Sequence, residues 1–196
     1  GTDLQKAEFL PRIADGTLVT TLALNESGIW YDSAGVQLEA KSTDNGFTLS
    51  GVKSFVPNAN SSSTFLVAAR TQPGSEPQGI TLFLVPAQVS GLRQNPLDTF
   101  DARRESDLIF SEVLVTNESI LGELHGGWEM LKTIMQWGAV AKCAEMVGQA
   151  EAVLAMTVDY VKQRVQFGRP IGSFQAIQDH CTDMAINLKG ARHITY

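Results

Sequence analysis

The stretch 164–183 most constrains the fold, because it places a sharp corner between two strongly helical segments. Its centre, Phe-Gly-Arg-Pro-Ile-Gly at 167–172, cannot continue either helix, since glycine is too free there and proline lacks the amide proton a helix uses. Ser173 then offers a hydroxyl that can cap the second helix. The pattern predicts a helix, a tight corner and a second helix.

Polar side chains at this corner suit an anionic ligand. Arg164 and Gln166 end the first helix, and Gln175 begins the second. A guanidinium beside the free amides of a helix start can bind a phosphate. The alternative is that Arg164 is a solvated cation that complements the helix dipole, and that the corner serves only packing.

The rest of the chain divides into a strand-rich part and a helical part. A short helix is predicted at 3–13, and proline-free apolar spacing predicts helices at 128–163 and 174–196. The predicted fold class is α+β, with an antiparallel β-barrel or sandwich followed by a pair of long helices. Short runs rich in Val, Thr and Leu, separated by turn residues, predict strands at 18–24, 36–42, 47–49, 52–56, 64–70, 80–85 and 108–115.

Composition limits the function classes. Of 196 residues, 43% are apolar and 18% charged, as in a globular protein, and the net charge of -6 argues against nucleic acid as a partner. No apolar run approaches the roughly 20 residues of a membrane span, so we predict a cytoplasmic protein without a membrane partner. Cys143 and Cys181 are predicted to be buried free thiols. We predict no metal site, because the histidines lack ligand spacing.

Two loops of the strand-rich part can carry cofactor chemistry. Residues 22–32 lie where a strand gives way to a loop, so backbone amides can address the edge of a planar ligand, and Asn25 can add a side-chain donor. Phe55, in the loop 51–59, can stack on a flat ring system. The alternatives are that the first loop is only a turn, and that Phe55 and Val56 are inward-facing strand residues.

The corner resembles a known family signature. The string Arg-x-x-Phe-Gly-x-Pro-Ile-x-x-Phe-Gln-x-Ile-Gln at 164–178 is similar to the C-terminal-domain signature of the flavin-dependent acyl-CoA dehydrogenases. The resemblance implies that Arg164, Phe167 and Gln175 reach the FAD of a neighbouring subunit. We place Gln166 with them.

Both loops of the strand-rich part resemble the flavin loops of the same family. Asn25 and Tyr31 stand where the family has the threonine that bonds the flavin and the serine that meets flavin or the pantetheine arm of the substrate. Phe55 stands where an aromatic covers the isoalloxazine, and Pro57 replaces a threonine with a residue that has no donor. The cofactor contacts predicted in this part are Leu22, Leu24, Asn25, Tyr31, Phe55, Val56 and Pro57, with Tyr31 also predicted to contact substrate.

The resemblance also implies a domain organisation. It predicts the end of an N-terminal helical domain at 1–16, a middle β-barrel domain at 17–118 and half of a C-terminal four-helix bundle at 119–196. The implied function is FAD-dependent α,β-dehydrogenation of an acyl-CoA thioester, as in fatty acid metabolism, with the chain itself a truncated and inactive fragment. No catalytic residue is predicted, because Gly138 stands where some members carry their base.

Partners and alternatives follow from the same resemblance. The family implies an acyl-CoA substrate, an electron-transfer flavoprotein as acceptor and a homo-oligomer, dimer or tetramer. Because Pro57, Tyr31 and Gly138 depart from the family pattern, an alternative is a non-catalytic partner subunit of a hetero-oligomeric enzyme. A ligand-binding barrel without redox chemistry is a third hypothesis.

Overall fold

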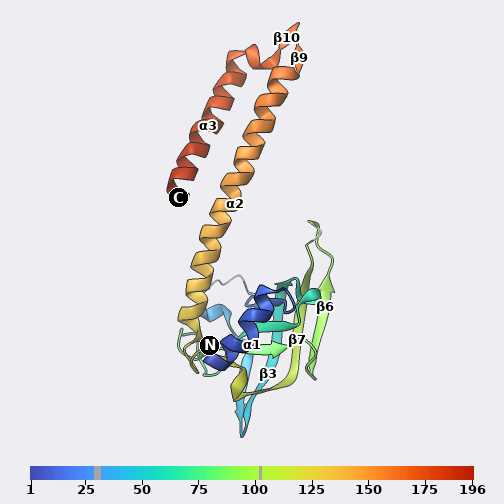
Figure 1. Ribbon diagram of the computed structural model, residues 1–196, viewed down its shortest axis with the longest axis vertical. Coiled ribbons are helices and arrows are strands. Elements are labelled where there is room, and N and C mark those ends of the chain that lie inside the picture. Colours follow the sequence, from blue (N-terminus) through green and yellow to red (C-terminus); the bar gives the residue numbers. More distant parts are fainter. Residues whose placement is uncertain (29–31, 102) are drawn as a thin grey trace. The chain divides into compact units, whose positions relative to one another are not determined.

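The computed structural model describes residues 1–28, 32–101 and 103–196. The chain forms two compact units, Gly1–Leu131 and Lys132–Tyr196, each of which is considered by itself. The first unit is a β-sheet with one short helix at its start, and the second is helical (Figure 1). The predicted α+β class is confirmed. The three predicted domain boundaries stay predictions.

The first helix, α1 (Asp3–Ala14), begins with a complete capping box. The Thr2 hydroxyl accepts from the Gln5 amide, while the Gln5 side chain accepts from the Thr2 amide. The Gln5 side-chain amide also donates to the carbonyl oxygens of Glu118 and Ile120, at 3.0 and 2.8 Å. These bonds satisfy helix-start amides and attach α1 to the sheet.

The sheet of the first unit has eight strands among the described residues. Most match the predicted segments, but 47–49 and 52–56 belong to one strand, and the strands at 92–97 and 120–121 were missed. The strands are β1 (Thr20–Ala23), β2 (Glu39–Thr43), β3 (Gly46–Pro57), β4 (Thr64–Arg70), β5 (Ile80–Pro86), β6 (Leu92–Leu97), β7 (Glu105–Thr116) and β8 (Ile120–Leu121).

The strand order corrects the expectation of a closed antiparallel barrel. The described strands run β6-β7-β3-β2-β4-β5-β8, and β1 also pairs with β4. Within this order β6 and β8 are the two ends, so the sheet is not closed. Both β1 and β2 pair with β4 in parallel, whereas the other pairs are antiparallel. Parallel pairing arises because the chain crosses over between these strands instead of returning through a hairpin.

The main core of the first unit lies against β3, β4, β5 and β7. Phe65, Val67 and Phe83 are fully buried, and the rings of Phe47 and Phe83 meet edge to face at 5.3 Å. A second cluster around Ile80, Leu82 and Leu131 holds the first turn of the long helix. The candidate loop 51–59 overlaps β3, and the candidate loop 22–32 follows β1, whose Ala23 is buried in the main core.

The second unit contains the predicted helix pair and corner. The helix α2 (Gly127–Gln163) begins in the first unit and continues here, and α3 (Gln175–Thr195) follows the corner. Arg192 of α3 forms an ion pair with Glu151 of α2 at 3.1 Å. Between the helices lies an apolar groove of about 580 Å³, lined by residues such as Met146, Leu154 and Leu188.

Many apolar side chains of the second unit are exposed. Val147 is buried, but Trp137, Met146 and Met156 are exposed, because two helices cannot cover the whole circumference of either one. Cys143, predicted to be a buried thiol, is also exposed, and Cys181 is half-buried. Both cysteines are free, as predicted. Among the described residues, no helix combines the length and apolar character that crossing a membrane requires.

The turn between β2 and β3 gives a test of this architecture. Gly46 has a φ of +156°, and a Cβ at this position would lie 2.1 Å from the Val115 carbonyl oxygen. We expect Gly46→Ala to lower the free energy of unfolding by about 3 kcal/mol, measured by urea denaturation.

The matched control is Gly16→Ala. Gly16 also has a positive φ, +77°, but no atom lies within 4 Å of the point that a Cβ would occupy there. This substitution should lower the free energy of unfolding by only ~1 kcal/mol, the cost of placing a residue with a Cβ in the left-handed conformation. Equal losses in the two variants would contradict the close β3–β7 approach.

Candidate functional site

The first candidate loop leaves the sheet at the end of β1. Leu22 and Leu24 are half-buried and pack against the smaller core cluster, whereas Asn25 is exposed. The Asn25 carbonyl oxygen accepts a hydrogen bond of 2.8 Å from the Ser54 amide in the second candidate loop. The two loops, which are separated in the sequence by residues 33–50, are therefore joined directly. Tyr31 lies outside the described residues.

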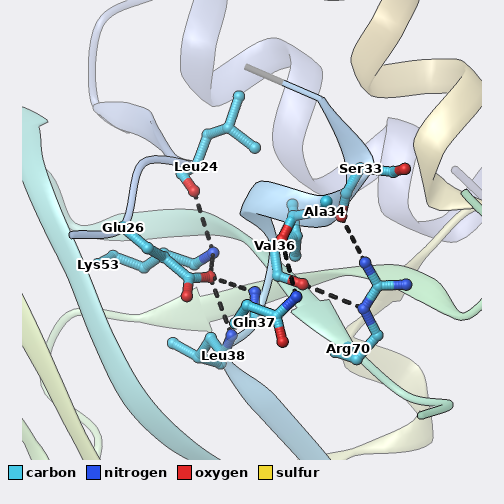
Figure 2. Close-up of polar contacts among 9 residues, drawn as sticks. All are labelled: Leu24, Glu26, Ser33, Ala34, Val36, Gln37, Leu38, Lys53 and Arg70. Carbon is cyan, nitrogen blue, oxygen red and sulfur yellow. Dashed lines mark hydrogen bonds and ion pairs between the residues drawn. The ribbon is translucent and has the colours of Figure 1, made fainter. Parts of the chain in front are cut away.

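Glu26 links the first candidate loop to the segment before β2 and to Lys53 of β3. Its Oε1 atom accepts from the backbone amides of Gln37 and Leu38, both at 2.9 Å, and from the Lys53 ammonium at 2.6 Å. The Lys53 ammonium also donates to the Leu24 carbonyl oxygen at 3.1 Å. Figure 2 shows the carboxylate between the lysine and the two amides.

Lys53 is fully buried, so its charge depends on this partner. Burial lowers the pKa of Lys53 from 10.5 to about 8, and the attraction of the Glu26 carboxylate opposes that shift. Lys53 and Glu26 were not among the predicted site residues, although both fall inside the two family-like loops. The signal available in the sequence was Lys53 itself, a charged residue inside a predicted strand that also carries Val52, Phe55 and Val56.

Arg70 fixes the neighbouring segment. Its guanidinium donates to the carbonyl oxygens of Val36, Ser33, Glu76 and Gln78 (Figure 2 shows the first two). Burial lowers the pKa of the Arg70 guanidinium, and the Glu26 carboxylate again acts in the opposite direction. These four bonds tie two loops to the end of β4, next to the amides that Glu26 engages.

The second candidate loop contains an irregularity in β3. Phe55 has a φ of +53° and is 58% exposed, whereas Val56 is buried. Phe55 is therefore not an inward-facing strand residue, and Val56 is one. Pro57 is exposed and pairs with Glu105 of β7. The exposed aromatic ring and Asn25 lie on loops that share a hydrogen bond, which brings two of the predicted contacts into one region.

The predicted contacts Arg164, Gln166, Phe167 and Gln175 lie along the corner of the second unit, between the end of α2 and the start of α3. Two-residue strands β9 (Val165–Gln166) and β10 (Arg169–Pro170) form a small hairpin with Phe167 and Gly168 at its turn, and the short 3-10 helix η4 (Ile171–Ser173) leads into α3. The Arg164 carbonyl oxygen accepts from the Ile171 amide at 2.8 Å, which closes the corner.

Aromatic packing supports this hairpin. Phe167 has a φ of +52° and is almost wholly exposed. Its ring meets the Phe174 ring edge to face at 6.1 Å, and the Arg169 guanidinium lies 4.1 Å from the Phe174 ring centroid. Among the described residues, the Arg164 guanidinium has no hydrogen-bond or ion-pair partner, so it is available to a ligand.

The predicted cap of the second helix is wrong. Phe174, not Ser173, is the N-cap residue of α3, and it makes no side-chain cap bond. Ser173 instead donates to the Pro170 carbonyl oxygen at 2.7 Å, within the 3-10 turn. The hydroxyl is taken up locally because η4 separates the hairpin from the helix. Gln178 donates to the Gly172 carbonyl oxygen and helps to hold this junction.

Comparisons with known proteins agree with the fold. The family description "Acyl-CoA dehydrogenase, middle domain" matches residues 21–113, and "Acyl-CoA dehydrogenase, C-terminal domain" matches residues 125–196. The chain belongs to the acyl-CoA dehydrogenase family, so the resemblance inferred from the sequence is confirmed.

Individual relatives are similar over the whole chain. The short-chain specific acyl-CoA dehydrogenase of Megasphaera elsdenii is 33% identical over 201 residues, covering 100% of this chain and 52% of the relative. The solved butyryl-CoA dehydrogenase of the same organism is 33% identical, with a TM-score of 0.93 and coverage of 100% and 52%. The FAD complex of PigA is 27% identical, with a TM-score of 0.94 and the same coverage. The chain therefore spans about half the length of these relatives.

The buried ion pair predicts a pH dependence of stability. The folded-state pKa of Lys53 is lowered to about 8 from 10.5, so between these values the unfolded chain binds more protons at this amine than the folded chain. Stability must therefore rise with pH in this window, by at most ~1.4 kcal/mol per pH unit.

The control is the double variant Glu26→Gln/Lys53→Met, which removes both charges and keeps the side-chain sizes similar. The free energy of unfolding of the wild-type chain, measured relative to this variant by urea denaturation, should increase from pH 8 to pH 10. A difference that stays flat or falls over this range would show that burial does not lower the Lys53 pKa.

Proposed function

We propose that this chain provides FAD-contacting residues of an FAD-dependent acyl-CoA dehydrogenase, which removes hydrogen from Cα and Cβ of an acyl-CoA thioester. The observation that carries the proposal is the direct joining of the two flavin-like loops, through the Ser54–Asn25 hydrogen bond and the Lys53–Glu26 ion pair. Both loops resemble flavin-binding segments of one family, and the two contacts place them next to each other, as the binding of one flavin by both loops requires.

The residues present fit FAD in their chemistry. A flavin ring needs an aromatic or apolar face and polar groups along its edge, and Phe55 supplies an exposed ring while Asn25 supplies an exposed amide. Pro57 can contribute shape but no hydrogen-bond donor. Leu22, Leu24 and Val56 would contribute through their backbone groups, since their side chains are partly or fully buried.

The corner fits another part of the same cofactor. The unpaired guanidinium of Arg164 suits a pyrophosphate, which accepts bidentate hydrogen bonds. The exposed amides of Gln166 and Gln175 can bond its oxygens or those of the ribose, and the exposed ring of Phe167 offers a stacking face. By the family resemblance, this corner would meet the FAD of a neighbouring copy, in a dimer or tetramer.

The chemistry divides between cofactor and protein. FAD supplies a hydride acceptor when it is bound. The described residues of this chain would bind and orient the ring and exclude water from one face, and none of them is assigned as the base that removes the α-proton. We therefore expect the 196-residue chain alone to bind FAD weakly and to be inactive. Acyl-CoA as substrate, an electron-transfer flavoprotein as acceptor and a cytoplasmic location belong to the proposal for the whole protein.

The first test uses the whole natural protein that carries this sequence. It should purify with the visible absorbance of oxidised flavin, and anaerobic addition of acyl-CoA thioesters of different chain lengths should bleach that absorbance. A protein that neither retains nor binds FAD contradicts the proposal.

A non-catalytic partner subunit is the second candidate. Pro57 favours it, because this residue removes a hydrogen-bond donor next to the exposed ring of Phe55. The same anaerobic experiment separates the two candidates: a partner subunit would bind FAD or assemble with a relative, but no acyl-CoA would reduce the flavin.

Arg164 gives a residue-level test in the same protein. We expect Arg164→Ala to raise the Kd for FAD about tenfold to a hundredfold, the loss of a charge-assisted bond worth ~1.5 to 3 kcal/mol, measured by flavin fluorescence titration.

Lys162→Ala is the matched control, because it removes the same charge two residues earlier in the sequence, inside α2, whereas Arg164 follows the end of that helix. It should change the Kd by less than about twofold. Equal effects of the two substitutions would indicate a general charge effect and contradict a specific contact by Arg164.

A further inference from the structure

The strand β3 carries one extra residue opposite β7. Lys53 pairs with Leu108 and Val56 pairs with Ser106, so Ser54 and Phe55 together stand opposite the single residue Asp107. Two residues facing one define a β-bulge, which re-aims side chains near functional sites.

The bulge changes the face on which Phe55 lies. In a regular strand, side chains alternate, so a residue two positions after the buried Lys53 would also point inward. Here the inward position is taken by Val56, which is buried, and Phe55 is 58% exposed. The extra residue therefore turns an aromatic side chain out of the core.

This arrangement costs backbone energy at Phe55. Its φ of +53° lies in the left-handed region, which a residue with a Cβ adopts at a cost of roughly 1–2 kcal/mol. Such strain persists only where the surroundings enforce it, and it gathers at functional sites.

Both amides of the bulge have an acceptor outside the regular ladder. The Ser54 amide donates to the Asn25 carbonyl oxygen at 2.8 Å, and the Phe55 amide donates to Oδ1 of Asp107 at 3.2 Å. On β7, Asp107 lies between the buried residues Ser106 and Leu108 and is itself half-buried on the opposite face. The Asp107 carboxylate therefore accepts the hydrogen bond that a backbone carbonyl oxygen of β7 would accept from β3 in a regular ladder.

We propose that Asp107 is a positioning residue, which holds Phe55 in its left-handed conformation so that the exposed ring is preorganised to stack on the cofactor. The proposal rests on the proposed function for the identity of the ligand. An ionised acceptor makes a stronger bond to an amide than a neutral one, which suits a position where backbone strain must be offset. Fixing the ring before binding avoids the entropy cost of ordering it afterwards.

The first experiment needs no cofactor. In the 196-residue chain, the NMR shift of the Phe55 amide proton should follow the titration of the Asp107 carboxylate, observed in the same sample, and should stop titrating in Asp107→Asn. Glu105→Gln, a neighbouring acidic residue on β7, should leave the titration intact. A Phe55 amide shift that changes with pH in Asp107→Asn as it does in the wild type overturns the proposal.

The second experiment measures FAD affinity in the whole natural protein. Asp107→Ala should raise the Kd about tenfold, which corresponds to ~1.4 kcal/mol, whereas Asp107→Asn, which keeps an acceptor oxygen, should stay within about threefold. In a Phe55→Gly background, Asp107→Ala should have no further effect, because its action passes through the Phe55 ring.

The outcomes separate the two hypotheses. An equal loss of affinity from Asp107→Ala with and without Phe55 shows that Asp107 acts elsewhere and overturns the positioning role. If wild-type protein does not bind FAD, the proposed function fails, and the cofactor part of the Asp107 proposal fails with it. The amide titration still decides whether Asp107 holds Phe55.

Discussion

The buried ion pair between Glu26 and Lys53 is the interaction on which the candidate site depends. A charge with no solvent exposure is tolerable only beside an opposite charge with good geometry, and here the separation is 2.6 Å. The same carboxylate accepts hydrogen bonds from two backbone amides of the segment before β2, and the same ammonium donates one to the Leu24 carbonyl oxygen. One pair therefore sets the relative positions of three segments that are distant in the sequence.

Two aromatic residues proposed to meet the cofactor share an unusual backbone conformation. Phe55 and Phe167 have φ values of +53° and +52°, and both rings are exposed. Each is supported by a different device: Phe55 by acceptors on both sides of a bulge, and Phe167 by the neighbouring ring of Phe174. Each unit therefore exposes a large apolar ring at a cost in backbone energy, a combination that is common at functional sites.

The sequence predicted the element types well, because strand and helix periods differ strongly on either side of residue 127. It missed β6, whose Pro96 and polar residues argue against a strand, and it divided β3 at Ser50-Gly51, which is a register shift inside one strand. The family-like loops predicted Asn25 and Phe55 as cofactor contacts, and these contacts stay predictions. Lys53 could signal a buried charge, but its pairing with Glu26 and the contact of Asp107 with Phe55 could not be predicted, because they depend on how separate segments pair and on the extra residue in β3.

The attachment of α1 lies beside β8, the strand at one end of the sheet, and so bears on how that edge can pair with other molecules. β8 is only two residues long and ends the strand order, and the Gln5 side chain occupies carbonyl oxygens at Glu118 and Ile120. A terminal strand with free carbonyls can recruit a strand from another molecule and start fibrous aggregation. By engaging these groups with a helix side chain, the protein removes a template for unwanted intermolecular pairing.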